Sequence, residues 1–166
     1  MKIACVTGHR YITNNSINRK AVNELIRLAV ESQIEKFLVG MSRGADFLFA
    51  QILSERKLNW VAVVPCVDQD KFWNDDDRSF YKSLLGKAED IVILHSEYHN
   101  GVMHYRNEHM IDNSEMLLAI YDDSGKGGTF HTVNLALKKH KRVLQFNPQT
   151  HEFNVIKSRQ LSLTLF

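Results

Sequence analysis

The chain has 166 residues, of which 44% are hydrophobic, and this composition suits one compact domain with a full core. Its formal net charge of +2 is too small to indicate a surface built for nucleic acid, so strong direct nucleic-acid binding is not expected. No apolar run approaches the roughly 18 residues that a membrane-spanning helix needs, and Met1-Lys2 leads into a short strand rather than a signal peptide. The sequence therefore predicts a cytoplasmic protein that makes no membrane contact.

Six short apolar runs are typical of strands buried on both faces, because their hydrophobic residues are mostly continuous rather than alternating. The predicted strands are Lys2–Val6, Lys36–Val39, Trp60–Val64, Asp90–Leu94, Met116–Tyr121 and Arg142–Phe146. The predicted helices between them are Ser16–Glu31, Asp46–Lys57, Asp75–Lys87, Tyr105–Asn113 and Thr129–Lys139. This alternation predicts an α/β fold with a doubly wound, mainly parallel sheet of about six strands and helices on both faces. The long connection from Val64 to Asp77 is interpreted either as a cover over a binding site or as a solvated acidic loop.

Three glycine-bearing turns follow predicted strands. They are Thr7-Gly8-His9-Arg10, Gly40-Met41-Ser42-Arg43-Gly44-Ala45-Asp46 and Gly125-Lys126-Gly127-Gly128-Thr129. In an open α/β sheet, ligands bind outside the carboxyl ends of the strands, and a helix N-terminus there offers unpaired N–H groups to phosphate. The turns therefore predict a site for a nucleotide or a nucleotide-derived phosphorylated ligand.

Individual side chains in these turns have two interpretations. Arg10 is a fork-shaped donor suited to phosphate or carboxylate, although arginines on exposed loops are common. Ser42 either caps the following helix or contacts the ligand, and Asp46 either caps or accepts a ribose hydroxyl. The N–H groups of Gly127-Gly128-Thr129, with the threonine hydroxyl, can converge on one anion, although the spacing is neither that of a Walker A loop nor G-x-G-x-x-G.

Evidence for catalysis or a resident metal is weaker. Glu108 and Asp112 lie four residues apart on one helix face, where they form either an acid–base pair or part of a charged surface. The eight histidines lack the cysteine or carboxylate spacing of a zinc site, so they are interpreted as solvated or adjacent to ligand. The only cofactor suggested is Mg²⁺ accompanying a nucleotide, near Asp122-Asp123, and the two cysteines are interpreted as small buried hydrophobic residues.

The three turns occur in order with Tyr105-Arg106-Asn107, Met110, Asp112 and Tyr121-Asp122, and Pro65, Gln69 and Trp73 lie between them. This set resembles the YpsA-like branch of the SLOG superfamily, whose fold is shared by DprA and the LOG phosphoribohydrolases. The resemblance covers roughly residues 1–146 and implies a Rossmann-like nucleotide-ligand-binding domain over residues 1–147, often a homodimer. The ligand residues then predicted are Gly8, His9, Arg10, Gly40, Ser42, Arg43, Gly44, Asp46, Tyr105, Arg106, Asn107, Gly127, Gly128 and Thr129.

The same resemblance bears on enzymatic activity. LOG enzymes cleave the N-glycosidic bond of nucleoside monophosphates with a Pro-Gly-Gly-x-Gly-Thr-x-x-Glu motif, whose glutamate acts at the ribose. Aligned on Gly128-Thr129, that position is Thr132 here. We therefore expect a sensor or regulatory module rather than an enzyme, and the alternative is a phosphoribohydrolase-like N-glycosidase that uses Glu108 or Asp112.

Residues 148–166 are predicted to form a C-terminal tail. The alternation of Leu161, Leu163 and Leu165 is typical of an edge strand. Alternatively, Gln160, Leu161, Leu163, Leu165 and Phe166 resemble the short peptide with which bacterial proteins dock on the DNA polymerase sliding clamp, an extended recognition mode. The sequence leaves both interpretations open.

Overall fold

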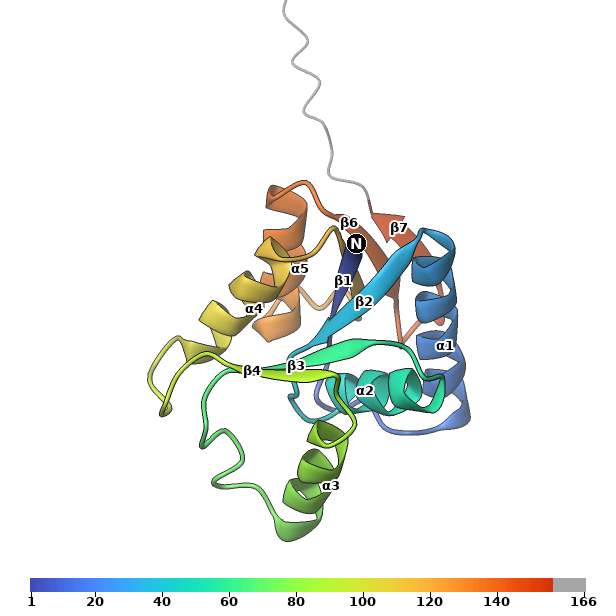
Figure 1. Cartoon of the computed structure of the whole chain (residues 1–166). Coiled ribbons are helices and arrows are strands. Elements are labelled where there is room, and N and C mark those ends of the chain that lie inside the picture. The colour runs from blue at the N-terminus through green and yellow to red at the C-terminus, as the bar shows by residue number, and fades with distance from the viewer. Residues whose placement is uncertain (157–166) are drawn as a thin grey trace, which may run out of the picture.

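The computed structural model describes residues 1–156, in which strands and helices alternate along the chain (Figure 1). The strands are β1 (Lys2–Gly8), β2 (Ile34–Val39), β3 (Trp60–Val64), β4 (Asp90–Ile93), β5 (Met116–Ile120), β6 (Arg142–Phe146) and β7 (Phe153–Ile156). The helices are α1 (Ser16–Glu31), α2 (Ala45–Glu55), α3 (Asp75–Leu85), α4 (Val102–Asp112) and α5 (Gly127–Lys138).

The seven strands form one sheet in the order β4-β3-β2-β1-β5-β6-β7. Every neighbouring pair is parallel except β6 and β7, which are antiparallel. The predicted fold class, an α/β fold of the Rossmann-like type with a mainly parallel sheet, is therefore confirmed.

The seventh strand lies in the segment that the sequence assigned to the tail. It runs over Phe153–Ile156, whereas the predicted edge strand at Leu161–Leu165 lies outside the described residues. Phe153 and Val155 remain 44% and 51% exposed, so this strand lacks the continuous buried run that identified the others. A four-residue strand with a largely exposed side gives little signal in a sequence.

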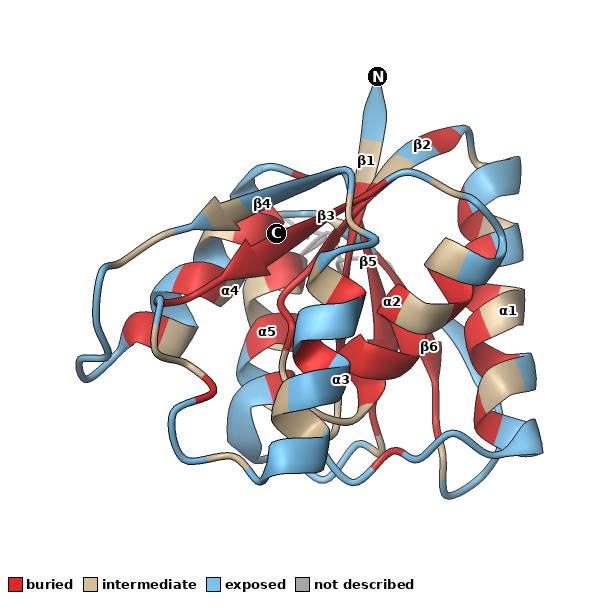
Figure 2. Ribbon diagram, turned by 60° about the horizontal axis from the view of Figure 1, so that its bottom comes forward, coloured by how far each residue is buried: buried red, intermediate tan, exposed pale blue. Residues whose placement is uncertain are grey.

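Two helical layers cover the sheet (Figures 1 and 2). The first, of α1, α2 and α3, packs on one face, and the second, of α4 and α5, packs on the other. All five residues of β3 and all five of β5 are buried, because both faces of these strands are covered. Successive side chains of a strand point to opposite faces of the sheet, so Leu118 packs against the first layer and Leu117 packs against the second.

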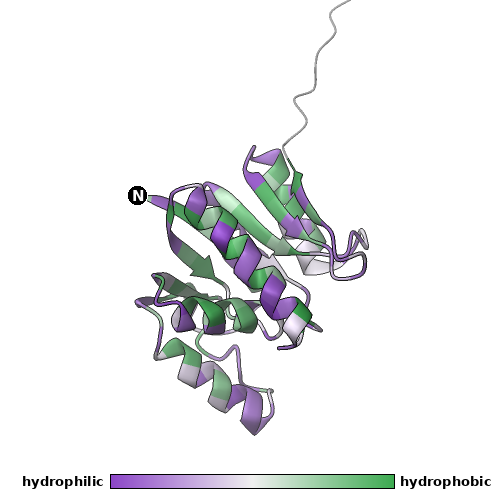
Figure 3. Cartoon of the chain, turned by 90° about the vertical axis from the view of Figure 1, so that its right-hand side faces the viewer, coloured by the Kyte–Doolittle hydropathy of each residue, from purple (hydrophilic) through white to green (hydrophobic). Residues whose placement is uncertain are grey.

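Side-chain caps begin α1 and α3, and the helices turn apolar residues inward. The side chain of Asn15 accepts a hydrogen bond from the backbone N–H of Asn18 and so caps α1. The buried stripe of α1 contains Val22, Leu25 and Ile26, and Figure 3 shows the alternation of hydrophobic and hydrophilic bands along the helices. No helix in residues 1–156 is both long enough and apolar enough to cross a bilayer.

The chain topology creates a crevice beside β1. From β1 the chain builds outward to β2, β3 and β4 through α1, α2 and α3, then returns through α4 to β5 on the other side of β1. The connections on the two sides lie on opposite faces of the sheet, so the loops after β1 and β5 diverge. Ligands of open α/β sheets bind at such a switch point.

Candidate functional site

A cavity of about 340 Å³ lies at this switch point. Four elements line it: the end of β1 with its following turn, the loop between β2 and α2, one face of α4, and the start of α5. The lining residues are Val6, Thr7, Gly8, His9, Arg10, Ser42, Asp46, Met103, His104, Arg106, Asn107, Met110, Gly128 and Thr129.

The structure brings most of the predicted ligand residues to this cavity. Those that line it are Gly8, His9, Arg10, Ser42, Asp46, Arg106, Asn107, Gly128 and Thr129. The predicted residues that do not line it are Gly40, Arg43, Gly44, Tyr105 and Gly127. Gly40, Gly44, Arg43 and Tyr105 make contacts elsewhere in the structure, and Gly127 starts α5 with a φ of 87°.

Two of the glycines outside the lining permit close backbone packing. A Cβ at Gly40 would lie 2.8 Å from Cζ of Arg106, so a side chain there would displace the guanidinium. Gly44 has a φ of 86°, and its Cβ would lie 2.4 Å from the backbone oxygen of Arg10. These glycines therefore shape the wall between the β1 turn and the β2–α2 loop.

Arg106 projects from α4 and is 5% exposed. Its guanidinium donates one hydrogen bond to the carbonyl of Gly40, a second to Oγ of Ser42 at 3.2 Å and a third to Oδ1 of Asn107 at 2.9 Å. All three acceptors are neutral, and Arg106 forms no ion pair with any residue in 1–156. Burial therefore lowers its pKa, although the nearby charge of Asp46 opposes this effect.

Asp46 lies in the first turn of α2 and is 5% exposed. Its Oδ2 accepts a hydrogen bond from the backbone N–H of Ser42 at 3.0 Å, which closes the glycine-bearing loop. Burial raises the pKa of the carboxyl group to about 6, although the positive charges of Arg106 and Arg10 oppose this shift. Among the described residues, Asp46 is the one carboxylate that lines the cavity.

Arg43 points away from the cavity, toward the long connection after β3. Its guanidinium lies 3.2 Å from Oδ2 of Asp77 and 5.1 Å from the centre of the Trp73 ring. In the same connection, Nε2 of Gln69 donates to the carbonyl of Met41 at 2.8 Å. Residues 65–74 therefore brace the β2–α2 loop from outside, and none of them lines the cavity.

Only one stripe of α4 faces the cavity. Its members are Met103, His104, Arg106, Asn107 and Met110. Tyr105 is 53% exposed on another side of the helix, with its ring centre 4.9 Å from that of His95. The consecutive triplet Tyr105-Arg106-Asn107 could not share one wall, because three consecutive residues of a helix span about 200° around its axis.

Helical periodicity could also have identified the cavity-lining residues of α4 that the sequence analysis did not predict. Met103 and Met110 supply an apolar wall, and His104 stands at one edge of the cavity. The ring of His104 lies 5.7 Å from that of His131, a partner from α5 that no motif pointed to. Val6 and Thr7, the other missed residues, lie at the end of β1, where Thr7 opens the first glycine-bearing turn but was not itself predicted to contact the ligand.

The N-terminus of α5 opens on the cavity without a side-chain cap. Lys126 occupies the N-cap position, where its side chain makes no capping hydrogen bond, and the first turn holds no acidic residue. A Cβ at Gly128 would meet no atom within 4 Å, so there is open space beside this backbone. The first N–H groups of a helix have no intrahelical acceptor, and together with the helix dipole they favour an anion.

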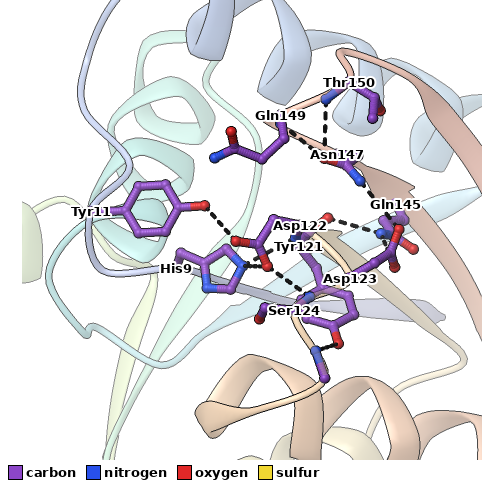
Figure 4. Close-up of polar contacts among 11 residues, drawn as sticks. His9, Tyr11, Tyr121, Asp122, Asp123, Ser124, Gln145, Asn147, Gln149 and Thr150 are labelled. Atoms are coloured by element: carbon purple, nitrogen blue, oxygen red, sulfur yellow. Dashed lines mark hydrogen bonds and ion pairs between the residues drawn. The ribbon is translucent and has the colours of Figure 1, made fainter.

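A polar network fixes the loop that leads into α5 (Figure 4). Nε2 of His9 accepts a hydrogen bond from the backbone N–H of Asp122 at 3.1 Å and lies 2.9 Å from Oδ1 of the same residue. The hydroxyl of Tyr11 donates to Oδ2 of Asp122 at 3.1 Å, and Gln145 donates to Asp123 at 2.9 Å. Both carboxylates considered for Mg²⁺ therefore belong to this loop network.

The two candidate catalytic carboxylates lie outside the cavity. Glu108 and Asp112 both bind Nζ of Lys139, the former at 3.3 Å. Thr132, at the position of the LOG glutamate, is 1% exposed, and its hydroxyl donates a hydrogen bond to the carbonyl of Gly128 at 2.9 Å. Across residues 1–156, no cluster of three histidine, cysteine or carboxylate side chains is suited to a metal ion.

Solved structures with the same fold belong to proteins whose names describe different roles. DNA processing protein A (DprA) from Streptococcus pneumoniae superposes with a TM-score of 0.66 at 14% identity, over 87% of this chain and 50% of that chain. This chain therefore spans about half the length of DprA. The molybdenum cofactor binding protein from Rippkaea orientalis gives 0.58 at 19% identity, over 88% and 76% of the two chains. At such identities, these similarities establish the fold alone.

Sequence relatives identify the family. An uncharacterised SPbeta prophage-derived protein of Bacillus subtilis (strain 168), YoqJ, is 34% identical over 122 residues, which cover 63% of this chain and 71% of YoqJ. The family model described as YspA SLOG family (YpsA) matches residues 6–156, from the middle of β1 to the end of β7. The predicted resemblance is thus confirmed, and the chain belongs to the YspA SLOG family.

Proposed function

We propose that the cavity binds a nucleotide or a nucleotide-derived ligand through a phosphate group and that the protein acts as a sensor or regulatory module. One observation carries this proposal: an uncapped helix N-terminus and an unpaired arginine line the same cavity. The guanidinium of Arg10 forms no hydrogen bond or ion pair with any described residue. Such unpaired donors are suited to a phosphate group.

The size of the cavity narrows the ligand class. At about 340 Å³ it lies near the lower end of small-molecule sites, which span roughly 300–1,000 Å³. This volume favours a nucleoside monophosphate or a compound of similar size over a dinucleotide. Met103 and Met110 provide an apolar surface for a base or another flat group.

Binding without hydrolysis is the form of the proposal that we favour. Glu108 and Asp112 are both engaged by Lys139 and lie outside the cavity lining. The N-glycosidase alternative would require one of them to leave Lys139 and reach the cavity. Product analysis of every ligand mixture separates the alternatives, since hydrolysis would release a free base.

Gly128→Asp is the substitution that tests the phosphate site. The open space at this position admits the side chain, and an aspartate in the first turn of α5 suits the helix dipole, so the fold should persist. Its carboxylate would compete for the helix N–H groups and repel an anion. We expect calorimetric titration to show an affinity loss of at least about 30-fold for any nucleotide that binds the wild-type protein.

Gly86→Asp is the matched control, with the same change of residue and charge. Gly86 ends α3 with a φ of −65°, lies outside the cavity, and its Cβ would make only ordinary contacts from 3.5 Å outward. Its aspartate lies at a helix C-terminus and should cost up to about 1 kcal/mol of stability while leaving affinity unchanged. Full affinity in a folded Gly128→Asp protein would refute the phosphate site.

A further inference from the structure

The anion-binding cavity contains a buried carboxylate that the phosphate site does not explain. Asp46 is 5% exposed and lines the same cavity as Arg10 and Gly128. It forms no ion pair with any described residue, and its one hydrogen bond comes from the backbone N–H of Ser42. A carboxylate has room for about four hydrogen bonds, so Asp46 retains most of its accepting capacity.

The burial of the Asp46 carboxylate costs free energy, and a ligand that donates hydrogen bonds to it can lower that cost. A buried carboxylate that lacks hydrogen bonds is unfavourable, and burial accordingly raises the pKa of Asp46 to about 6. A ligand consisting only of anionic oxygen atoms would add repulsion to this cost. A ligand that also presents hydroxyl or amino donors would instead satisfy the carboxylate while its anionic part lies elsewhere in the cavity.

We propose that Asp46 is a specificity-determining residue that accepts hydrogen bonds from the sugar hydroxyls of a ribonucleoside phosphate, while the phosphate lies at Gly128 and Thr129. This inference rests on the proposed function and deepens it, because it names the second recognition point of the ligand. Arg106 lies near Asp46 and donates a hydrogen bond to Ser42, so the β2–α2 loop that precedes the carboxylate is held in place. Ligands that lack the hydroxyl groups are thereby disfavoured.

A purely structural role for Asp46 gives a different expectation. Its hydrogen bond from Ser42 closes the loop, and an asparagine of the same shape can accept that bond through its side-chain oxygen. Asp46→Asn therefore keeps the loop and removes only the charge and the strong acceptor. Asp76→Asn, at an exposed position in the first turn of α3, is the matched control.

The experiment measures affinities by calorimetry at about pH 7.5 for three proteins: wild type, Asp46→Asn and Asp76→Asn. The probes are the four common ribonucleoside 5′-monophosphates, their 2′,3′-dideoxy counterparts, and sulfate, a dianion without hydroxyl donors. We expect the wild-type protein to prefer the best-binding ribonucleotide over its dideoxy form by at least about 10-fold. In Asp46→Asn this preference should fall below about 3-fold while sulfate binds more tightly, and Asp76→Asn should match the wild type.

The outcomes separate this inference from the proposed function. Equal affinity for the ribo and dideoxy forms in the wild-type protein, or a full preference retained by Asp46→Asn, would overturn the role of Asp46. If Gly128→Asp still abolishes binding in that case, the phosphate site stands alone. If no nucleotide of the panel binds the wild-type protein, the proposed function fails together with this inference.

Discussion

Arg106 and Asp46 illustrate how single side chains set the electrostatics of the cavity. Arg106 is buried against three neutral acceptors, and Asp46 is buried with one backbone donor, so neither charge is cancelled by an ion pair within the described residues. Two charges of opposite sign on one buried wall create a local dipole rather than a uniform positive field. This arrangement favours a ligand that carries both an anion and hydrogen-bond donors.

Asp46 should also make stability depend on pH. Burial raises its pKa from an ordinary 3.8 to about 6, so the folded protein binds this proton more tightly than the unfolded chain does. The resulting stabilisation is fully present below the ordinary pKa and is lost as the pH rises through about 6. We expect Asp46→Asn to gain up to about 3 kcal/mol in free energy of unfolding, relative to wild type, between about pH 4 and about pH 7.

Urea denaturation at several pH values checks this expectation, with Asp76→Asn as the reference for losing an exposed carboxylate. Parallel stability curves for the wild-type and Asp46→Asn proteins would show that the Asp46 carboxyl group keeps its ordinary pKa when folded. Such a result would also weaken the argument that the carboxylate lacks partners.

Among the elements, the contact between the β1 turn and the start of α2 depends on Gly44. This residue has a φ of 86°, and its Cβ would lie 2.4 Å from the backbone oxygen of Arg10. Gly44→Ala should therefore suffer both backbone strain and a clash with rigid backbone, at a cost of about 3 kcal/mol or more. Gly125→Ala is the matched control, because Gly125 has a φ of 73° but open space around it.

Backbone strain alone predicts a loss of about 1–2 kcal/mol for Gly125→Ala. Thermal and urea unfolding of both variants give the difference between them, which contains the clash together with the additional strain of Gly44, whose ψ of −121° lies outside the left-handed helical region. Equal losses at the two positions would mean that the β1 turn shifts easily, and the wall of the cavity would then be adaptable rather than rigid.

The helices and strands were largely predictable from sequence, and the cavity was predictable in part. Continuous apolar runs identified β3 and β5, because burial on both faces imposes that pattern on a strand. Motifs located the turns but could not show which side chains turn inward: Arg43 faces Trp73, and Tyr105 faces His95. Side-chain direction depends on helical phase and on contacts between distant segments, which a short motif does not contain.

At the scale of the whole molecule, the seven described strands and every residue that lines the cavity lie within residues 1–156. The last described strand, β7, ends at Ile156, and the family match ends at the same residue. The lining of the cavity ends earlier still, at Thr129. The segment Gln160–Phe166 lies outside the described residues, and its two interpretations, an edge strand and a clamp-docking peptide, make opposite predictions.

Deletion of residues 160–166 separates these interpretations. For a docking peptide, we expect the truncated protein to keep its melting temperature and nucleotide affinity, because every identified part of the sheet and cavity is retained. Pull-down of the purified sliding clamp should succeed with the full chain and fail with the truncated one. In the full chain, Leu161→Ala combined with Phe166→Ala should reproduce that failure, since alternate apolar side chains anchor such a peptide. A melting temperature lowered by about 4 °C or more, with no clamp retained by the full chain, would instead identify the segment as an edge strand whose removal costs at least about 1 kcal/mol.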